Sequence, residues 1–240
     1  MKDISYYSDQ LGISLSDSQL EQFNIYMNMV IEKNKVMNLT AITEPEEFHL
    51  KHFADSLSIV SATGLAAPIK EKAVSMIDVG TGAGFPSIPL KIAFPEIRLT
   101  LLDSLNKRVN FLNDVVEALK LKDVKTIHAR AEEGARQKEL RDSFDFVVSR
   151  AVAGMNVLTE YCLPYAKPGG LFIAYKSGEI ENELSDAQKA IKLLRGKLEN
   201  VVNFNLVDSD IERSFVIIRK EAATPKQFPR KAGTAKKDPL

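Results

Sequence analysis

The 240-residue chain is long enough for one large domain with an appendage, and its 32 basic and 32 acidic side chains give a formal net charge of zero. That balance argues against indiscriminate nucleic-acid binding, so an anionic partner has to meet a local basic patch. The single cysteine excludes an internal disulfide, residues 1–7 lack the apolar core of a signal peptide, and no segment is long enough to span a membrane, so we expect a cytoplasmic protein.

Residues 1–70 form the first predicted part, an N-terminal helical region. Asp17 and Ser18 are predicted to cap a helix whose apolar side chains recur at helical spacing. A second helix is predicted to begin near Pro45, because proline is favoured in the first helical turn. Residues 1–50 carry three basic and eight acidic side chains, hence a net charge of −5.

Residues 71–222 form the second part, in which predicted strands and amphipathic helices alternate. Strands are predicted over residues 74–79, 97–102, 124–129, 144–149, 171–176, 201–207 and 213–219. This alternation predicts a parallel sheet covered by helices on both faces. The link between the last two strands is too short for a crossover helix, so these strands are predicted to form an antiparallel hairpin. The fold class is therefore α/β and Rossmann-like, a mostly parallel seven-stranded sheet with an antiparallel last strand and an N-terminal helical cap.

A glycine-rich loop, Asp78-Val-Gly80-Thr-Gly82-Ala-Gly84-Phe85-Pro86, follows the first of these strands and opens onto a predicted helix. Alternate glycines let the backbone turn sharply and approach a ligand closely. A dinucleotide fingerprint needs glycine or alanine at position 85 or 87, where this chain has phenylalanine and serine. The spacing resembles motif I of S-adenosylmethionine-dependent methyltransferases instead. The predicted cofactor residues in this loop are Asp78, Gly80, Gly82, Gly84 and Phe85.

The ends of the next two strands supply further cofactor candidates. Asp103, followed by Ser104, stands about 20 residues after the loop, where an acid that binds ribose hydroxyls is expected. The alternative is a solvated Asp that caps the following helix. Ala131 and Glu132 follow the third strand, where a backbone amide and a carboxylate can bind the adenine edge, although an acid in a first helical turn is common.

Residues 223–240 form the third part, a basic and flexible C-terminal tail. From residue 224 onward it carries five basic side chains against one acidic one, and three prolines discourage a helix. We therefore expect it to be mobile or extended until an anionic partner orders it; the alternative is a tail that only improves solubility. The candidate phosphate contacts are Lys107, Arg108, Lys226, Arg230 and Lys231.

Six motifs in order give the chain a specific resemblance. They are Phe48-His-Leu-Lys-His52-Phe-Ala-Asp55-Ser56-Leu57, the glycine-rich loop, Asp103-Ser-x-x-Lys107-Arg108, Ala131-Glu132, Ser149-Arg150-Ala151 and Pro225-Lys-x-x-Pro229-Arg230-Lys231. Together they resemble the bacterial ribosomal RNA small-subunit methyltransferase G family, also called glucose-inhibited division protein B, from about residue 20 to the C-terminus.

The resemblance implies methyl transfer from S-adenosylmethionine to N7 of one guanine in 16S rRNA. It maps cofactor positions onto Gly80, Phe85, Ala131, Glu132 and Arg150. It also places the segment with Asp55 and Ser56 at the cofactor cleft, so these two residues and Arg150 are candidates for positioning substrate. The implied partner is 16S rRNA or a small-subunit ribosomal particle, with no membrane and a monomeric protein.

The residues agree with that chemistry in two respects. Methylases of exocyclic amino groups carry an Asn/Asp-Pro-Pro-aromatic motif after the fourth strand, where this chain has Val148-Ser-Arg-Ala151. Methylases of pyrimidine C5 need a nucleophilic cysteine, whereas Cys162 lies among apolar residues that predict an inert thiol. Guanine N7 has a lone pair and no proton, so no general base is expected and no catalytic residue is assigned. His49, His52 and Asp55 fan out too widely along a helix to share a metal, so no metal site is predicted.

Two alternatives from other functional classes stay open on the sequence alone. The first is a nicotinamide-dependent reductase, against which Phe85 counts because it stands where the dinucleotide fingerprint needs glycine. The second is a ribosome-interaction protein that binds S-adenosylmethionine without catalysis. The zero net charge argues against a general RNA binder, and a turnover assay separates this alternative from an enzyme.

Overall fold

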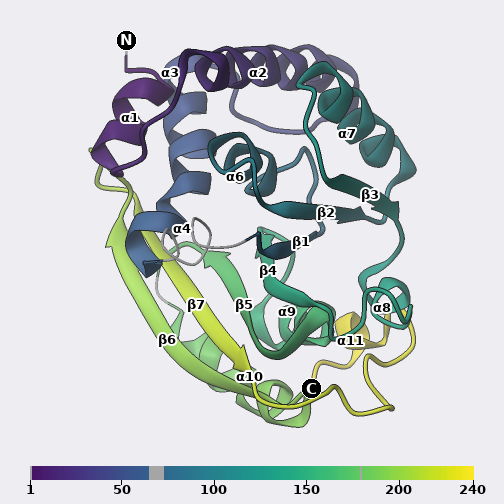
Figure 1. The fold of residues 1–240 in the computed structure, drawn as a ribbon. Coiled ribbons are helices and arrows are strands. Elements are labelled where there is room, and N and C mark those ends of the chain that lie inside the picture. The colour runs from purple at the N-terminus through teal and green to yellow at the C-terminus, as the bar shows by residue number, and fades with distance from the viewer. Residues whose placement is uncertain (1, 65–72, 179) are drawn as a thin grey trace.

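The computed structural model describes residues 2–64, 73–178 and 180–240, which form a seven-stranded sheet with helices on both faces (Figure 1). The strands are β1 (Ser75–Val79), β2 (Arg98–Asp103), β3 (Val124–His128), β4 (Phe144–Arg150), β5 (Ala166–Lys176), β6 (Gly196–Asn205) and β7 (Glu212–Lys220). Their order across the sheet is β3-β2-β1-β4-β5-β7-β6. The pairs among β1 to β5 are parallel, and β7 runs antiparallel to both β5 and β6. The predicted fold class is confirmed.

The helices divide between the two faces of the sheet. The first group comprises α1 (Ile4–Gln10), α2 (Asp17–Met37), α3 (Pro45–Phe48), the π-helical segment η1 (His49–Ala54), α4 (Asp55–Thr63), α6 (Ser87–Ala93) and α7 (Asn106–Ala118). The second comprises α8 (Ala131–Gly134), α9 (Met155–Cys162), the 3₁₀ turn η2 (Leu163–Tyr165), α10 (Glu181–Leu193) and α11 (Thr234–Lys237). Figure 1 shows the first group above the sheet and the second below it. None of the helices in the described ranges has the length and apolar character needed to cross a membrane.

Each group of helices encloses its own hydrophobic core, and the strands contribute to both. Along β4, Phe146 and Val148 belong to the core beneath the N-terminal helices, whereas Val147 between them belongs to the other. Successive side chains of a strand point to opposite faces, so a sheet covered on both sides needs apolar residues at consecutive positions. The continuous apolar runs in the sequence reflect this arrangement.

The structure moves the predicted N-cap of α2 by one residue. Ser16, rather than Asp17 or Ser18, caps the helix: its hydroxyl accepts from the Gln19 amide at 3.3 Å, and the Gln19 side chain accepts from the Ser16 amide at 2.8 Å. This reciprocal pair is a capping box, and glutamine fills the position that glutamate often takes. The predicted start of the second helix at Pro45 is confirmed.

The predicted division into parts changes at the C-terminal end. Residues 224–240 are not extended: Phe228 and Ala235 are buried, and the short helix α11 lies beside α8 and α9 (Figure 1). The expectation of a flexible tail is therefore wrong for the folded chain, because apolar side chains between the basic ones bury themselves in the second core. The predicted boundary between residues 70 and 71 lies outside the described residues.

Candidate cofactor and substrate site

The loop after β1 is tied to the end of β2 by its backbone. The amides of Gly80 and Thr81 both donate to the Leu102 carbonyl, at 2.8 and 3.2 Å. Gly80, Gly82 and Gly84 all have positive φ angles, of 76°, 62° and 108°. Such angles are costly for any residue with a Cβ atom, so this loop conformation depends on glycine.

The three glycines nevertheless have different surroundings. A Cβ at Gly84 would lie 2.7 Å from Ile88 and 2.8 Å from the Tyr26 hydroxyl, so the protein interior leaves no room there. At Gly80 it would lie 2.8 Å from a methyl of Val152. At Gly82 it would meet no atom within 4 Å. Gly84 therefore serves packing, whereas Gly82 presents open space on the side where a ligand can approach.

A buried carboxyl lies beneath this loop. Asp78 is fully buried, and the Thr81 hydroxyl donates to its Oδ2 at 2.9 Å. Among the described residues, the other oxygen, Oδ1, and the nearby Ser87 hydroxyl have no hydrogen-bond partner. Burial raises the pKa of Asp78 to about 7, because the charged form loses its hydration. A buried polar atom without a well-formed hydrogen bond is rare in a protein interior, and here the Ser87 hydroxyl lies beside the carboxyl.

Asp103 at the end of β2 joins the glycine loop to the next helix. Its Oδ2 accepts from the Gly82 amide at 3.0 Å, and its Oδ1 accepts from the Leu105 amide at 2.9 Å. Arg108 approaches Oδ2 at 3.5 Å. The side chain therefore shapes the turn that leads into α7 and also supports the loop, and its remaining lone pairs can accept from a ribose diol.

The carboxyl ends of β1, β2 and β3 surround a small cavity of about 140 Å³. Its lining includes Gly80, Ser104, Ala131, Glu132 and Val152. Glu132 is 5% exposed, and its Oε1 accepts from the Gly233 amide at 2.7 Å. Four residues predicted from three separate motifs thus meet in one place, which we call the adenosine-side cavity.

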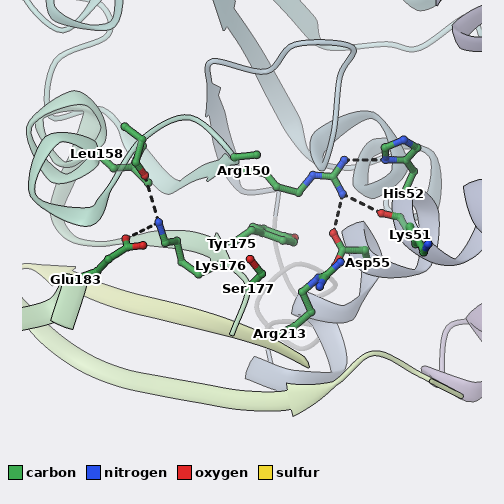
Figure 2. Close-up of a pocket in the computed structure, with 12 residues that line it drawn as sticks. Lys51, His52, Asp55, Arg150, Leu158, Tyr175, Lys176, Ser177, Glu183 and Arg213 are labelled. Carbon is green, nitrogen blue, oxygen red and sulfur yellow. Dashed lines mark hydrogen bonds and ion pairs between the residues drawn. The ribbon is translucent and has the colours of Figure 1, made fainter. Parts of the chain in front are cut away.

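A second cavity, of about 340 Å³, lies between the end of β4, the helices η1 and α4, and the strands β5 and β7 (Figure 2). Arg150 points into it, with Nη1 donating to Asp55 Oδ2 at 2.7 Å. Arg213 donates to the other oxygen of Asp55, Oδ1, at 2.6 Å. Asp55 thus links two arginines from strands at different places in the sheet. We call this space the arginine-side cavity.

Besides Asp55, Arg150 contacts the aromatic rings of His52 and Phe85. These rings stack with centroids 4.4 Å apart and planes 6° from parallel, and the guanidinium carbon of Arg150 lies 5.1 Å from the Phe85 ring. Burial, followed by the charge of Arg150, lowers the pKa of His52 to about 3, so the imidazole is neutral. Its Nδ1 accepts from Arg150 at 3.2 Å, which leaves Nε2–H to donate to the Thr40 hydroxyl at 2.7 Å.

The structure gives Ser56 a different place from the predicted one. Its side chain is fully buried and donates to the His52 carbonyl at 2.5 Å, while its own carbonyl accepts from the Tyr175 hydroxyl at 2.8 Å. Ser56 therefore holds the π-helical segment against β5 and does not face the cavity. A serine next to a cleft residue gives no sign in the sequence of which way its hydroxyl points.

The arginine-side cavity also contains residues that the sequence analysis did not select. They are Lys51, Tyr175, Lys176, Glu183 and Arg213, all visible in Figure 2. Lys176 donates to Glu183 at 2.6 Å, and Arg213 is the second residue of the antiparallel strand β7. Their positions depend on the order of strands in the sheet, and β7 inserts between β5 and β6 without any local motif to announce it.

Two further predictions concern reactive side chains. Cys162 is fully buried, as predicted, and burial raises the pKa of its thiol well above the ordinary value, which disfavours the reactive thiolate. His52 and Asp55 both bind the Arg150 guanidinium, and His49 does not take part in this contact. The described residues contain no group of three histidine, cysteine or acidic side chains arranged to hold a metal.

The predicted RNA contacts have unequal surroundings. Lys107, Lys226 and Lys231 are exposed, and Arg108 lies partly against Asp103. Arg230 instead forms a bidentate ion pair with the buried Glu160, with Nη2 to Oε2 at 2.7 Å. Its charge is paired within the fold, and its role as a phosphate contact stays a prediction.

Comparisons with known proteins agree with this geometry. A family model described as GidB, rRNA small subunit methyltransferase G, matches residues 19–214. The chain is 52% identical over 230 residues to Ribosomal RNA small subunit methyltransferase G of Lachnoclostridium phytofermentans, covering 96% of this chain and 93% of that relative. For the protein of the same name in Acetivibrio thermocellus the identity is 50% over 229 residues, covering 95% and 92%. In fold, the chain is similar to a solved O-methyltransferase from Bacillus cereus in complex with SAH, with a TM-score of 0.55, 17% identity and coverage of 82% of this chain and 91% of that one.

Proposed function

The chain belongs to the rRNA small subunit methyltransferase G family, and from this premise we propose that it transfers the methyl group of S-adenosylmethionine to N7 of one guanine in 16S rRNA. The observation that carries the proposal is the pair of cavities on the two sides of the segment after β4. Val152 lines the adenosine-side cavity, whereas its neighbours Ala151 and Ala153 line the arginine-side cavity. A cofactor and a substrate base can thus approach each other from opposite sides of one short segment.

The residues present fit S-adenosylmethionine better than a dinucleotide. When bound, this cofactor supplies an electrophilic methyl group on a sulfonium. The donor set suits it: Asp103 can accept from the ribose, Glu132 can accept from the adenine amino group, and Gly82 leaves open space above the loop. A dinucleotide instead places its pyrophosphate on an accessible helix N-terminus. Here α6 begins at the fully buried Ser87, so its N-terminal amides are covered.

The arginine-side cavity is proposed to receive the target guanine. An enzyme that acts on a base within RNA takes that base out of the stack and into a pocket, and this cavity has a suitable size and polarity. The titratable side chains that border it are already committed: His52 to Arg150, Asp55 to two arginines, and Glu183 to Lys176. N7 of guanine has no proton to remove, so a site without a free general base is sufficient.

The contribution of the chain is then alignment. Arg150 is fixed by Asp55, His52 and the Phe85 ring, and it retains N–H donors that can face the guanine edge or the cofactor. Fixed donors avoid the loss of side-chain freedom on binding and hold the reacting atoms in line. Lys51 and Arg213 border the same cavity and pair with Glu47 and Asp55. We propose that they also contact the flanking phosphates, which position an RNA without selecting its bases.

Exposed lysines outside the arginine-side cavity supply further candidate contacts to RNA. The exposed Lys107, Lys226 and Lys231 are proposed to contact the backbone of the 16S rRNA, either alone or in a small-subunit particle. We propose that a monomer acts on this substrate, since both cavities are lined by one chain. A ribosomal RNA substrate also places the reaction in the cytoplasm.

Calorimetric titration with S-adenosylhomocysteine and with NAD tests the cofactor assignment. We expect S-adenosylhomocysteine to bind and NAD to give no heat of binding. The matched variant Gly82→Val should lose S-adenosylhomocysteine binding, because its branched side chain fills the open space above the loop. Binding of NAD without binding of S-adenosylhomocysteine would contradict the proposal.

A further inference from the structure

The C-terminal segment, residues 224–240, contacts Glu132, one of the residues that line the adenosine-side cavity. In Figure 1 it runs in yellow beneath α8 and ends near α11, next to α8 and α9. Phe228 buries its side chain in the core on that face of the sheet, and Ala235 is also buried. Glu132, which lines the cavity, is the second residue of α8. The segment is therefore placed to influence a cofactor residue directly.

Two arginines hold the first half of the segment through its backbone. Arg141 donates to the carbonyls of Thr224, Pro225 and Phe228 at 2.9, 3.1 and 2.8 Å. Arg136 donates to the Pro229 carbonyl at 2.6 Å. A guanidinium that binds several carbonyls fixes the path of a chain that has no regular secondary structure of its own. The path of the segment up to residue 229 is thus determined by the methyltransferase domain.

The second half is anchored by Arg230. Both oxygens of Glu160 accept from this residue: Oε1 from the backbone amide at 2.7 Å and from Nε at 3.0 Å, and Oε2 from Nη2 at 2.7 Å. Glu160 is 1% exposed, so its charge needs this partner. A bidentate pair with an additional amide leaves little freedom at residue 230. The turn that follows, residues 231–233, starts from a fixed point.

That turn ends on Glu132. The Gly233 amide donates to Glu132 Oε1 at 2.7 Å, and it is the one hydrogen bond to this carboxylate found among the described residues. Gly233 has a φ of 84°, a left-handed conformation that glycine adopts readily, and this conformation directs its amide toward α8. With Oε1 occupied by the amide, Oε2 is left to accept from a ligand in the cavity.

We propose that Arg230 and Gly233 are positioning residues for cofactor binding, and that they act by holding the Glu132 carboxylate toward the adenine amino group. The inference rests on the proposed function, which supplies the adenine contact of Glu132. It assigns the C-terminal segment to cofactor selectivity rather than to RNA binding alone. The segment thereby links a motif near the end of the chain to a cofactor residue, Glu132, that precedes Gly233 by 101 positions.

The test compares S-adenosylhomocysteine with S-inosylhomocysteine, in which an oxygen acceptor replaces the adenine amino donor. A carboxylate acceptor favours the first ligand and repels the second. Affinities are measured by calorimetry for the full chain, Glu132→Gln, Arg230→Ala and the double variant. We expect Arg230→Ala to weaken S-adenosylhomocysteine binding by about three- to tenfold. The ratio of the dissociation constants of the two ligands should therefore move closer to one. In the Glu132→Gln background, Arg230→Ala should have no further effect.

Two additional variants separate positioning from folding. Truncation after Arg230 keeps the pair with Glu160 but removes the Gly233 donor. It should therefore bring the dissociation constants of the two ligands closer together, and it tests the proposal even if Arg230→Ala fails to fold. Lys236→Ala removes one exposed charge from the same segment and should leave both affinities unchanged. Thermal melting of each variant establishes that it is folded at the temperature of the titration.

The outcomes distinguish this inference from the proposed function. If the wild-type chain binds S-adenosylhomocysteine selectively and the truncation and Arg230→Ala keep that selectivity, the inference is wrong and the cofactor assignment stands. The inference would also be wrong if the affinity for both ligands fell equally, or if the effects of the two substitutions added in the double variant. A residue that only stabilises the fold does not distinguish the two ligands. If the wild-type chain binds neither ligand, the proposed function fails first.

Discussion

Arg150 shows how one side chain can be fixed before a substrate arrives. Its guanidinium donates to Asp55 and His52 and lies over the Phe85 ring, so its plane is set by three partners. His52 can accept from it only as a neutral imidazole, and burial keeps it neutral. The arrangement depends on planarity as well as charge, and lysine cannot reproduce it.

Arg150→Lys is therefore expected to lower the single-turnover rate of methyl transfer by about 10- to 100-fold, because alignment is lost while positive charge remains. Tritiated-methyl transfer at saturating RNA measures this rate. Arg219→Lys is the matched control, since Arg219 pairs with Glu199 on an exposed part of the sheet. A rate for Arg150→Lys within twofold of the wild type would exclude the alignment role.

Asp78 makes stability depend on pH. Its pKa in the folded chain is about 7, against an ordinary value of 3.8. Between these values the folded state keeps a proton that the unfolded state releases, so this group's contribution to stability is present below pH 4 and is lost as the pH rises through 7. His52, whose folded pKa is about 3, acts in the opposite direction and costs stability as the pH falls below 6.5.

The isosteric variant Asp78→Asn isolates the first of these effects. We expect it to raise the free energy of unfolding by about 1–3 kcal/mol more at pH 8, where a buried charge is removed, than at pH 5, where the folded chain keeps Asp78 protonated. Urea unfolding at the two pH values measures the difference. The same change in unfolding free energy at both pH values would show that Asp78 is not the titrating group.

At the scale of elements, the strands and the glycine loop could be predicted from the sequence because local patterns determine them. Apolar runs marked the strands, and alternate glycines marked the loop. The start of β5 was missed because Gly169 and Gly170 look like a turn, whereas in the structure the strand passes through them with an irregular register against β4. The C-terminal segment was missed because its anchors, Arg141 and Glu160, belong to distant elements.

The packing role of Gly84 in the glycine loop can be tested by substitution. Gly84→Ala should lower the free energy of unfolding by about 2–5 kcal/mol, because a methyl group there meets Ile88 and Tyr26 in addition to the unfavourable φ. Tyr26 cannot withdraw, since it is fully buried and its hydroxyl donates to the Ala83 carbonyl at 2.8 Å. Denaturant unfolding provides the measurement.

The control for that prediction is Gly169→Ala. Gly169 also has a positive φ, of 86°, but a Cβ there would meet no atom within 4 Å. Backbone strain alone should cost it about 1–2 kcal/mol. If both variants lose the same stability, the interior around Gly84 accommodates a methyl group and the packing role assigned to this glycine is wrong.

At the scale of the whole molecule, sheet topology assembles the site from segments that are far apart in sequence. Arg213 meets Asp55 across 158 positions because β7 inserts next to β5, near the end of β4. The motifs identified four of the residues that line the adenosine-side cavity, because the ends of its strands carry recognisable residues. Half of the arginine-side cavity had no such signal, since ordinary lysines and arginines acquire their role only from the order of the strands.

Methyl transfer to 16S rRNA that lacks the modification tests the central claim most directly. The purified chain is incubated with tritiated S-adenosylmethionine and this RNA, and the product is digested and analysed by mass spectrometry. We predict one methyl group per RNA, recovered as 7-methylguanosine at a single position. Recovery of N2-methylguanosine or 5-methylcytidine, or the absence of transfer by a chain that binds the cofactor, would contradict the account.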